Sequence, residues 1–178
     1  EVLVEKENIP LQGYFTDANF FRVFSFALLA GNEATALKAP GSMVLTESAA
    51  MKVFGSLDVV GKSLQMDNQQ SFMITGVMRD HPKNSHLAFE ALASYATLAA
   101  GFQNHKNGWV DYANEYVYVL LNKKSSVDDL QQYLAGVAEQ EYAGTTVKVR
   151  LKAQSVDGLV TKELRNGIGP QWEASGFV

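Results

Sequence analysis

Residues 43–55 read MVLTESAAMKVFG and join an expected strand to an expected helix. The run Met43–Leu45 is apolar and short, which is typical of a buried strand. Thr46 can cap the helix that follows, and Glu47 favours its first turn because a carboxylate there interacts with the positive end of the helix dipole. Gly55 is expected to end the helix. The apolar face of this helix would consist of Ala49, Ala50, Val53 and Phe54.

Downstream of Gly55 the pattern changes to alternation, which indicates β-structure. Leu64 and Met66 alternate with polar residues, a turn signal follows at Asp67-Asn68, and residues 72–77 contain a second alternating run. This arrangement predicts a β-hairpin. Strand character continues at residues 87–92, and the Gly-, Asn- and His-rich stretch 101–114 is expected to be an exposed loop.

The residues before position 43 predict three further elements. Val2 and Val4 lie among acidic residues and predict a half-buried strand. After Asp17, which can cap a helix, the aromatic side chains of residues 20–24 fall on one helical face and are expected in the core. A short polar helix is expected from about residue 32 to residue 38, ahead of a Pro-Gly break.

The segment from Glu115 to Ala153 predicts a strand–helix–strand unit. Residues 115–121 are strongly β-prone, and Ser126 can cap the helix that follows. Residues 147–151 alternate as a final strand, and the whole has the length of a βαβ crossover. We expect the helix to pack onto a sheet that contains the strands at Tyr116 and Val147. The helical residues expected to face that sheet are Val127, Leu130, Leu134 and Val137.

Composition limits the classes of function. The chain has 178 residues with a 47% hydrophobic share, enough for a sizeable core in one domain or two small subdomains. Fifteen basic residues against nineteen acidic ones give no cationic surface for nucleic acid. Without cysteine, no disulfide or thiolate site can form. The longest apolar stretch, residues 20–30, falls short of the about 20 residues that span a bilayer. The first residues lack a signal-peptide core, so the chain is expected to begin inside a folded region.

Gly61-Lys62-Ser63 looks like the end of a phosphate-binding loop, but its context does not fit. Five residues separate Gly55 from Gly61 where that motif needs four, and a strand is expected after Ser63 instead of a helix. We therefore expect no nucleotide and no cofactor here.

A metal site and a hydrolytic triad also lack support from the sequence. His81 and His86 lie five residues apart across a proline, so neither a helix nor a strand presents them together, and nearby Asp80 and Glu90 do not complete a ligand pattern. The serines Ser48, Ser85 and Ser94 lie in no nucleophile elbow. We therefore assign no catalytic, cofactor-binding or metal-binding residue.

Seven segments in order resemble the MacB-like periplasmic core domain of permeases of the MacB and FtsX superfamily. They are residues 19–24 (NFFRVF), 28–31 (LLAG), 36–37 (AL), 44–50 (VLTESAA), 54–64 (FG followed by VGKSL at 60–64), 72–77 (FMITGV) and 82–87 (PKNSHL). In the second half of the chain the resemblance thins to the pattern of residues 116–121, the helix from Ser126 and the strand from Thr146.

The resemblance implies an α+β fold in two parts. A porter-like α+β subdomain would comprise residues 1–15 and 86–153, with its first segment truncated. A strand-rich, sabre-like insert would cover residues 16–85, and residues 154–178 would form a tether towards the next membrane helix.

The resemblance also implies a function that is mechanical and not catalytic. The chain would be the periplasmic domain of an ABC-type export permease of the inner membrane, and it would pass ATP-driven motion of the membrane helices to a substrate or partner. Its partners would be the permease's own helices, a second permease copy or half, a separate cytoplasmic ATPase, and a periplasmic adaptor or a substrate peptide or lipoprotein, with no nucleic acid. Two alternatives stay open: a stand-alone binding module for a peptide or lipid, with its cleft between the subdomains, and a hydrolase.

Overall fold

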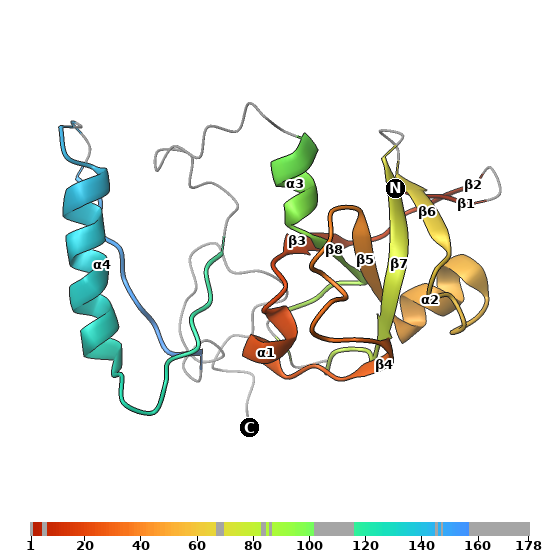
Figure 1. Cartoon of the computed structure of the whole chain (residues 1–178), viewed down its shortest axis with the longest axis horizontal. Coiled ribbons are helices and arrows are strands. Elements are labelled where there is room, and N and C mark those ends of the chain that lie inside the picture. Colours follow the sequence, from red (N-terminus) through yellow and green to blue (C-terminus); the bar gives the residue numbers. More distant parts are fainter. Residues whose placement is uncertain are drawn as a thin grey trace, which may run out of the picture. The chain divides into compact units, whose positions relative to one another are not determined.

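The chain divides into two compact units in the computed structural model. Unit 1 comprises residues 1–105 with 168–170, and unit 2 comprises residues 106–167 with 171–178. The structure describes residues 2–4, 7–66, 70–82, 85, 87–101, 116–144, 146 and 148–156. Within these residues, unit 1 carries the β-sheet and unit 2 carries one long helix (Figure 1).

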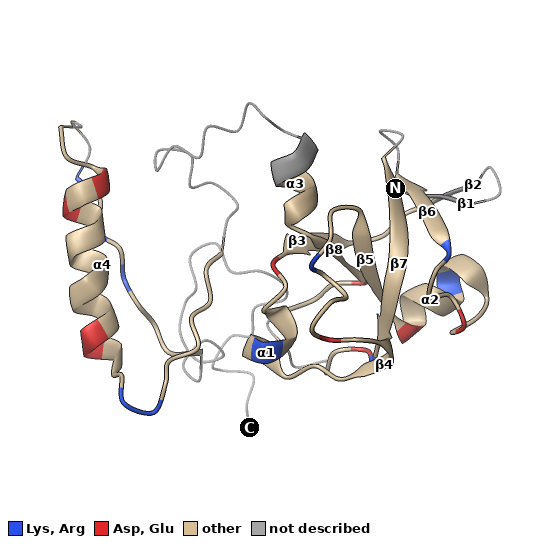
Figure 2. Ribbon diagram, viewed as in Figure 1, with Lys and Arg blue, Asp and Glu red and all other residues tan. Residues whose placement is uncertain are grey.

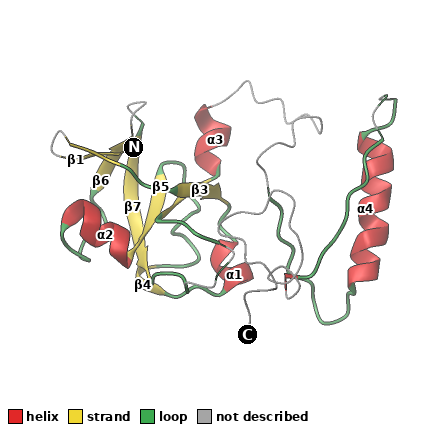
Figure 3. Cartoon of the chain, turned by 180° about the vertical axis from the view of Figure 1, so that it is seen from behind, coloured by secondary structure: helices red, strands yellow, loops and turns green. Residues whose placement is uncertain are grey.

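Unit 1 is built on an eight-stranded mixed sheet in the order β2-β1-β6-β7-β5-β8-β3, with β4 paired to β7. Figure 3 shows the strands in yellow. The strands are β1 (Val2–Val4), β2 (Glu7–Ile9), β3 (Gly13–Thr16), β4 (Leu28–Gly31), β5 (Ser42–Thr46), β6 (Ser63–Met66), β7 (Ser71–Met78) and β8 (Ala91–Ser94). β5 runs parallel to β7 and antiparallel to β8, and β8 runs parallel to β3. The helices of the unit are α1 (Phe20–Phe24), α2 (Glu47–Phe54) and α3 (Ala96–Gly101).

β5 and α2 form the centre of unit 1. All five residues of β5 are buried, because the strand lies between β7 and β8. The Thr46 side chain accepts a hydrogen bond from the Ala49 amide (3.2 Å) and caps α2, while Gly55 ends the helix with a φ of 64°. The strand and helix predicted at residues 43–55 are therefore confirmed. The core is formed by Met43, Leu45, Ala49, Ala50, Val53, Val59, Leu64, Phe72, Ile74, Val77, Ala91 and Ala93.

The predicted hairpin is also present. β6 pairs with β7 in antiparallel fashion, with Leu64 opposite Phe72, although the turn at residues 67–69 lies outside the described residues. β8 begins at Ala91, later than the strand expected at residues 87–92. The hairpin strands β6 and β7 and the strand β8 all contribute buried residues to the same core.

Residues 32–38 form turns, so the short helix predicted there is wrong. The Asn32 side chain accepts a hydrogen bond from the Ala34 amide (2.9 Å), a local bond that competes with helix formation. Asp17 likewise bonds to the Asn19 amide (2.6 Å), and Asn19 takes the N-cap position of α1. α1 nevertheless buries Phe20 and Phe21 as predicted.

The predicted helix of unit 2 is confirmed as α4 (Val127–Glu141). Its N-terminus is a capping box: the Ser126 hydroxyl accepts from the Asp129 amide (3.1 Å), and the Asp129 carboxylate accepts from the Ser126 amide (2.8 Å). Val127 is exposed, whereas Leu130, Leu134 and Val137 are half-buried, so the apolar face is narrower than predicted.

The two strands predicted beside α4 are wrong for the residues that the structure describes. Residues 116–121 and 148–153 have no strand pairing, and Val117 is 86% exposed. High β-propensity fits a side chain to a sheet but supplies no neighbouring strand, and neither segment has one among the described residues. α4 therefore does not pack on a sheet there; its Gln131 side chain bonds instead to the backbone of residues 151 and 153. Residues 115, 145 and 147 lie outside the described part.

The division into a porter-like subdomain and an insert at residues 16–85 stays a prediction. Strands from inside that range (β4 to β7), strands from outside it (β1, β2 and β8) and β3, which ends at Thr16 on the boundary, share one sheet. The tether assigned to residues 154–178 lies mostly outside the described residues.

Candidate functional site

The N-terminus of α2 holds the first group of polar side chains. The Asp80 carboxylate accepts hydrogen bonds from the Ser48 amide (3.1 Å) and from the Ser48 hydroxyl. Burial of the Asp80 carboxylate raises its pKa, but the hydrogen bonds from Ser48 lower the pKa by more, so it lies below the ordinary value. The carboxylate thus stays charged and joins the chain after β7 to the first turn of α2, where the helix dipole favours a negative charge.

A second group joins three separated segments. The Lys52 ammonium lies 2.8 Å from Glu90 Oε1 and donates to the Pro10 carbonyl (2.6 Å), while Glu90 Oε2 accepts from the Gln12 amide (2.9 Å). Burial raises the pKa of Glu90, but its bonds to Lys52 and Gln12 outweigh this effect and lower the pKa below its usual value. This ion pair fixes the segment before β3 against α2 and β8.

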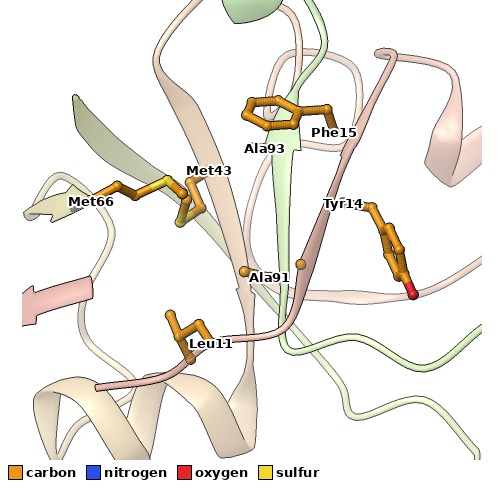
Figure 4. Close-up of a pocket in the computed structure, with 8 residues that line it drawn as sticks. Leu11, Tyr14, Phe15, Met43, Met66, Ala91 and Ala93 are labelled. Carbon is orange, nitrogen blue, oxygen red and sulfur yellow. The ribbon is translucent and has the colours of Figure 1, made fainter. Parts of the chain in front are cut away.

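A hollow of unit 1 lies on the face of the sheet, beside β3, β5, β6 and β8 (Figure 4). Its volume is about 100 Å³. The lining is mainly apolar and consists of Leu11, Gly13, Tyr14, Phe15, Met43, Met66, Ala91 and Ala93. Figure 4 shows Met43 and Met66 close together, with the Tyr14 ring directed away from them. Binding pockets for small molecules usually measure about 300–1,000 Å³, so this hollow is a packing feature of the core edge.

The structure separates the side chains considered for metal binding. The His81 ring lies tilted against the Phe89 ring (centroids 5.5 Å apart, interplanar angle 47°), and its Nε2 accepts from the Phe89 amide at 3.4 Å. Asp80 is bonded to Ser48 and Glu90 to Lys52, so the three groups have different partners. His86 lies outside the described residues, and within the described part no three His, Asp or Glu side chains are grouped to hold a metal ion.

His81 and Phe89 belong to the edge of an aromatic cluster on α1. The Phe20 ring stacks on Phe26 (centroids 5.6 Å apart, interplanar angle 6°) and meets Phe89 edge to face (5.8 Å). Such pairs add about 0.5–1.5 kcal/mol beyond the area that they bury. The aromatic residues of α1 therefore serve the core, as the sequence predicted.

The glycine-lysine motif also has a structural role. Gly61 adopts a φ of 89° and its amide donates to the Ile74 carbonyl (2.8 Å), and β6 begins at Ser63, as predicted, where a phosphate-binding loop requires a helix. The Lys62 ammonium lies 5.4 Å from the centre of the Phe54 ring. The motif is thus the turn between α2 and the hairpin.

The three serines considered as nucleophiles are in different environments. Ser48 is bonded to Asp80, and the Ser85 hydroxyl accepts from the Leu87 amide (3.1 Å). Ser94 is fully buried on β8, and its hydroxyl has no hydrogen-bond partner among the described residues. No histidine of the described residues is bonded to any of them, so the structure does not assemble a triad from these candidates in the described part.

Sequence comparison decides the family. The sequence matches the model of the MacB-like periplasmic core domain over residues 2–137, which include the whole sheet of unit 1 and most of α4. This chain belongs to the MacB-like periplasmic core domain family. The MacB-like domain is a periplasmic domain of an ABC-type permease. No curated protein sequence matches the chain.

Two solved structures share the fold of this MacB-like domain. A domain from Porphyromonas gingivalis, assigned to a permease protein, has a TM-score of 0.60 at 19% identity and covers 88% of this chain and 74% of its own. The periplasmic region of MacB from Actinobacillus actinomycetemcomitans has a TM-score of 0.52 at 16% identity, covering 76% and 61% of the two chains. The predicted α+β fold is confirmed. Among the described residues of the MacB-like domain, no helix has the length and apolarity to cross a membrane.

Proposed function

We propose that this MacB-like domain passes the motion of the permease's membrane helices to an exported substrate or to a periplasmic partner. The observation that carries the proposal is the family match over residues 2–137. The energy would come from ATP hydrolysis by a separate cytoplasmic ATPase, and the domain would lie on the periplasmic side of the inner membrane. The partners would be the permease's own helices, a second permease copy or half, and a periplasmic adaptor or a substrate peptide or lipoprotein.

The tight packing of unit 1 supports the proposal that this unit moves as one rigid body. Val44, Leu45, Phe72 and Ile74 are 0% exposed, and close-packed interiors transmit strain with little compression. Hydrogen bonds join segments that are far apart in sequence, such as the bond of 2.9 Å from the Gly41 amide to the Thr97 hydroxyl. A displacement applied at one strand would therefore move the whole sheet.

The hydrogen bonds of the polar side chains are also consistent with a mechanical role. Ser48, Asp80, Glu90 and His81 each bond to a neighbour that fixes the fold. A domain that carries out no reaction can assist export by contacting its partner differently in two states. On this proposal the MacB-like domain is not an enzyme.

Lengthening the tail tests the mechanical role. In the intact permease, a ten-residue Gly/Ser insert after Gly169 should absorb motion, because a Gly-rich linker behaves as a flexible coil. We expect transport to fall while ATP hydrolysis by the partner ATPase stays near the parental rate. Residue 169 lies outside the described part, so the position follows from the sequence alone.

The matched control carries the same insert between Asp67 and Asn68, in the connection from β6 to β7. This connection joins two strands of one hairpin, so transport should be retained. Undiminished transport with the insert after Gly169 would contradict the mechanical role. It would favour the alternative of a passive module for a peptide or lipid.

A further inference from the structure

Residues 148–153 of unit 2 form a stretched segment that runs beside α4 (Figure 1). The sequence Lys-Val-Arg-Leu-Lys-Ala alternates charged with apolar residues, as a strand with one solvent face does. No backbone-to-backbone hydrogen bond joins this segment to another part of the chain that the structure describes. The segment therefore has the pattern of a strand without a ladder.

One edge of this segment is already occupied. The Gln131 side chain donates from Nε2 to the Leu151 carbonyl (2.8 Å) and accepts at Oε1 from the Ala153 amide (3.0 Å). In extended backbone, the carbonyl of one residue and the amide two residues later point to the same side, as they do towards a neighbouring strand. The Gln131 amide thus takes the place of one peptide group of a neighbouring strand. The amides and carbonyls of residues 150 and 152 point to the opposite edge.

The two faces of the segment differ in charge. Lys148, Arg150 and Lys152 are exposed, whereas Val149 and Leu151 are half-buried. Successive cations in an extended chain lie about 6.6 Å apart. No ion pair joins these three cations to an acidic residue in the described part of the chain.

We propose that residues 148–153 are a docking edge for an extended acidic segment of a periplasmic protein, which adds to the side of residues 150 and 152 that no other described residue pairs with. Its acidic side chains would lie opposite Lys148, Arg150 and Lys152, and its alternate apolar side chains would extend the row of Val149 and Leu151. Addition of a strand takes its affinity from the main chain and its specificity from alternate side chains. The inference rests on unit 2 alone and does not require the proposed transport function.

The charges of α4 favour an extended acidic segment over an anionic membrane surface. α4 carries Asp128, Asp129, Glu139 and Glu141 and no basic residue (Figure 2). A flat anionic surface large enough to cover both α4 and this segment would meet these carboxylates as well as the three cations, and the carboxylates would repel it. A single extended chain can follow the row of cations alone, with its charges opposite theirs.

The test is binding of a fluorescent peptide to the full 178-residue chain. The probe, Ac-TEVEVEVT-NH2, alternates glutamate with valine, and a second peptide, Ac-TEEEVVVT-NH2, has the same composition without the alternation. We expect at least tenfold tighter binding of the alternating peptide by fluorescence anisotropy. The triple variant Lys148→Glu, Arg150→Glu, Lys152→Glu should lose this binding by at least tenfold and prefer a Lys/Val peptide, because like charges opposite each other repel. If the triple variant loses its helical CD signal, the single variant Arg150→Glu replaces it, and this variant should also bind the alternating peptide more weakly.

The matched control is Lys123→Glu, Lys124→Glu, which reverses two exposed cations on the turn before α4. It should change the affinity less than threefold. Equal binding of the two acidic peptides, an equal loss in the control variant, or no binding of the alternating peptide at millimolar concentration would each overturn the proposal. A different result would also overturn it: the parental chain binds phosphatidylglycerol vesicles, the triple variant does not, and both bind the peptide equally. This outcome would assign the row of cations to lipid binding.

Discussion

Gly31 and Gly136 show how differently one residue type can be constrained. Gly31 ends β4 with a φ of 100°, and a Cβ built there would lie 2.4 Å from the Thr75 carbonyl oxygen and 2.9 Å from the Gly76 Cα. Both neighbours are backbone, so they cannot turn aside. Gly136 lies inside α4, and outside the helix's own backbone no atom of the described residues lies within 4 Å of an added Cβ.

Alanine should therefore have opposite effects at these two positions. We expect Gly31→Ala to lower the free energy of unfolding by about 2 kcal/mol or more, because of backbone strain and the close contact with β7. Gly136→Ala should stabilise α4 by about 0.5–1 kcal/mol, because glycine is a poor helix former. Thermal melts followed by far-UV circular dichroism would check both. A neutral Gly31→Ala would show that β4 does not approach β7 so closely.

The ion pair of Glu90 makes a prediction about pH. The pKa of Glu90 is lowered in the folded chain, so the stability that the pair contributes is complete above the ordinary value of 4.5. It is lost as the pH falls through the lower, folded pKa. Glu90→Gln should cost about 0.5 kcal/mol at pH 7, a small amount because both side chains are partly exposed.

Urea unfolding at pH 7 and near pH 3 would measure this difference. The cost of Glu90→Gln should shrink at the lower pH, because the parental carboxyl takes up a proton as the pH falls through its folded pKa. Glu139→Gln, at an exposed site on α4, is the control and should leave stability nearly unchanged at both pH values. If the loss of stability in Glu90→Gln were the same at both pH values, Glu90 would stabilise the fold through packing and not through its charge.

At the scale of elements, α4 depends on its N-terminal cap. The Ser126 hydroxyl accepts from the Asp129 amide, and the pKa of Asp129 is lowered by its hydrogen bonds with Ser126. Ser126→Ala should lower the stability of the helix by about 1 kcal/mol, since it leaves the Asp129 amide without its acceptor. The neighbouring Ser125→Ala is a matched control, because no side-chain hydrogen bond of Ser125 is present in the described part. Helicity by circular dichroism should fall in the first variant and not in the second.

The elements that could be predicted from the sequence are those with local signals. Thr46 and Gly55 mark the two ends of α2, and the alternation at residues 63–77 marks a hairpin whose strands pair with each other. β4 and α3 were not predicted, and for β4 the reason is that its signal is not local. β4 exists through its pairing with β7, which needs Gly31 opposite Gly76, 45 residues later.

Residues 116–121 show the opposite error. Their composition is typical of a strand, yet a strand also needs a neighbour, and the sequence of the segment contains no information about one. The sequence also did not show which polar side chains of unit 1 pair with each other. Lys52 and Glu90 lie 38 positions apart, and the hollow of Figure 4 takes its lining from four strands and from the connection before β3. The residues were visible in the sequence, but their partners were not.

At the scale of the whole molecule, the sheet of unit 1 joins residues on both sides of the insert predicted at residues 16–85. β5 lies between β7, inside that range, and β8, outside it. The Phe20 ring meets Phe89, and the Gly41 amide bonds to Thr97, so two further contacts cross the same boundary. A segment can be an insert in the course of evolution without being able to fold alone.

These contacts predict that residues 1–105 fold by themselves and that residues 16–85 do not. The longer fragment keeps all eight strands, whereas the shorter one loses β8 and exposes one edge of β5, whose Val44 and Leu45 are 0% exposed in the structure. It also loses the bonds of Glu90 to Lys52 and Gln12. Urea unfolding of the two fragments would decide the matter, with a single cooperative transition expected for residues 1–105 and a gradual, non-cooperative change for residues 16–85. Cooperative unfolding of residues 16–85 with comparable stability would instead establish the insert as an independent subdomain, because its core would then not need β8.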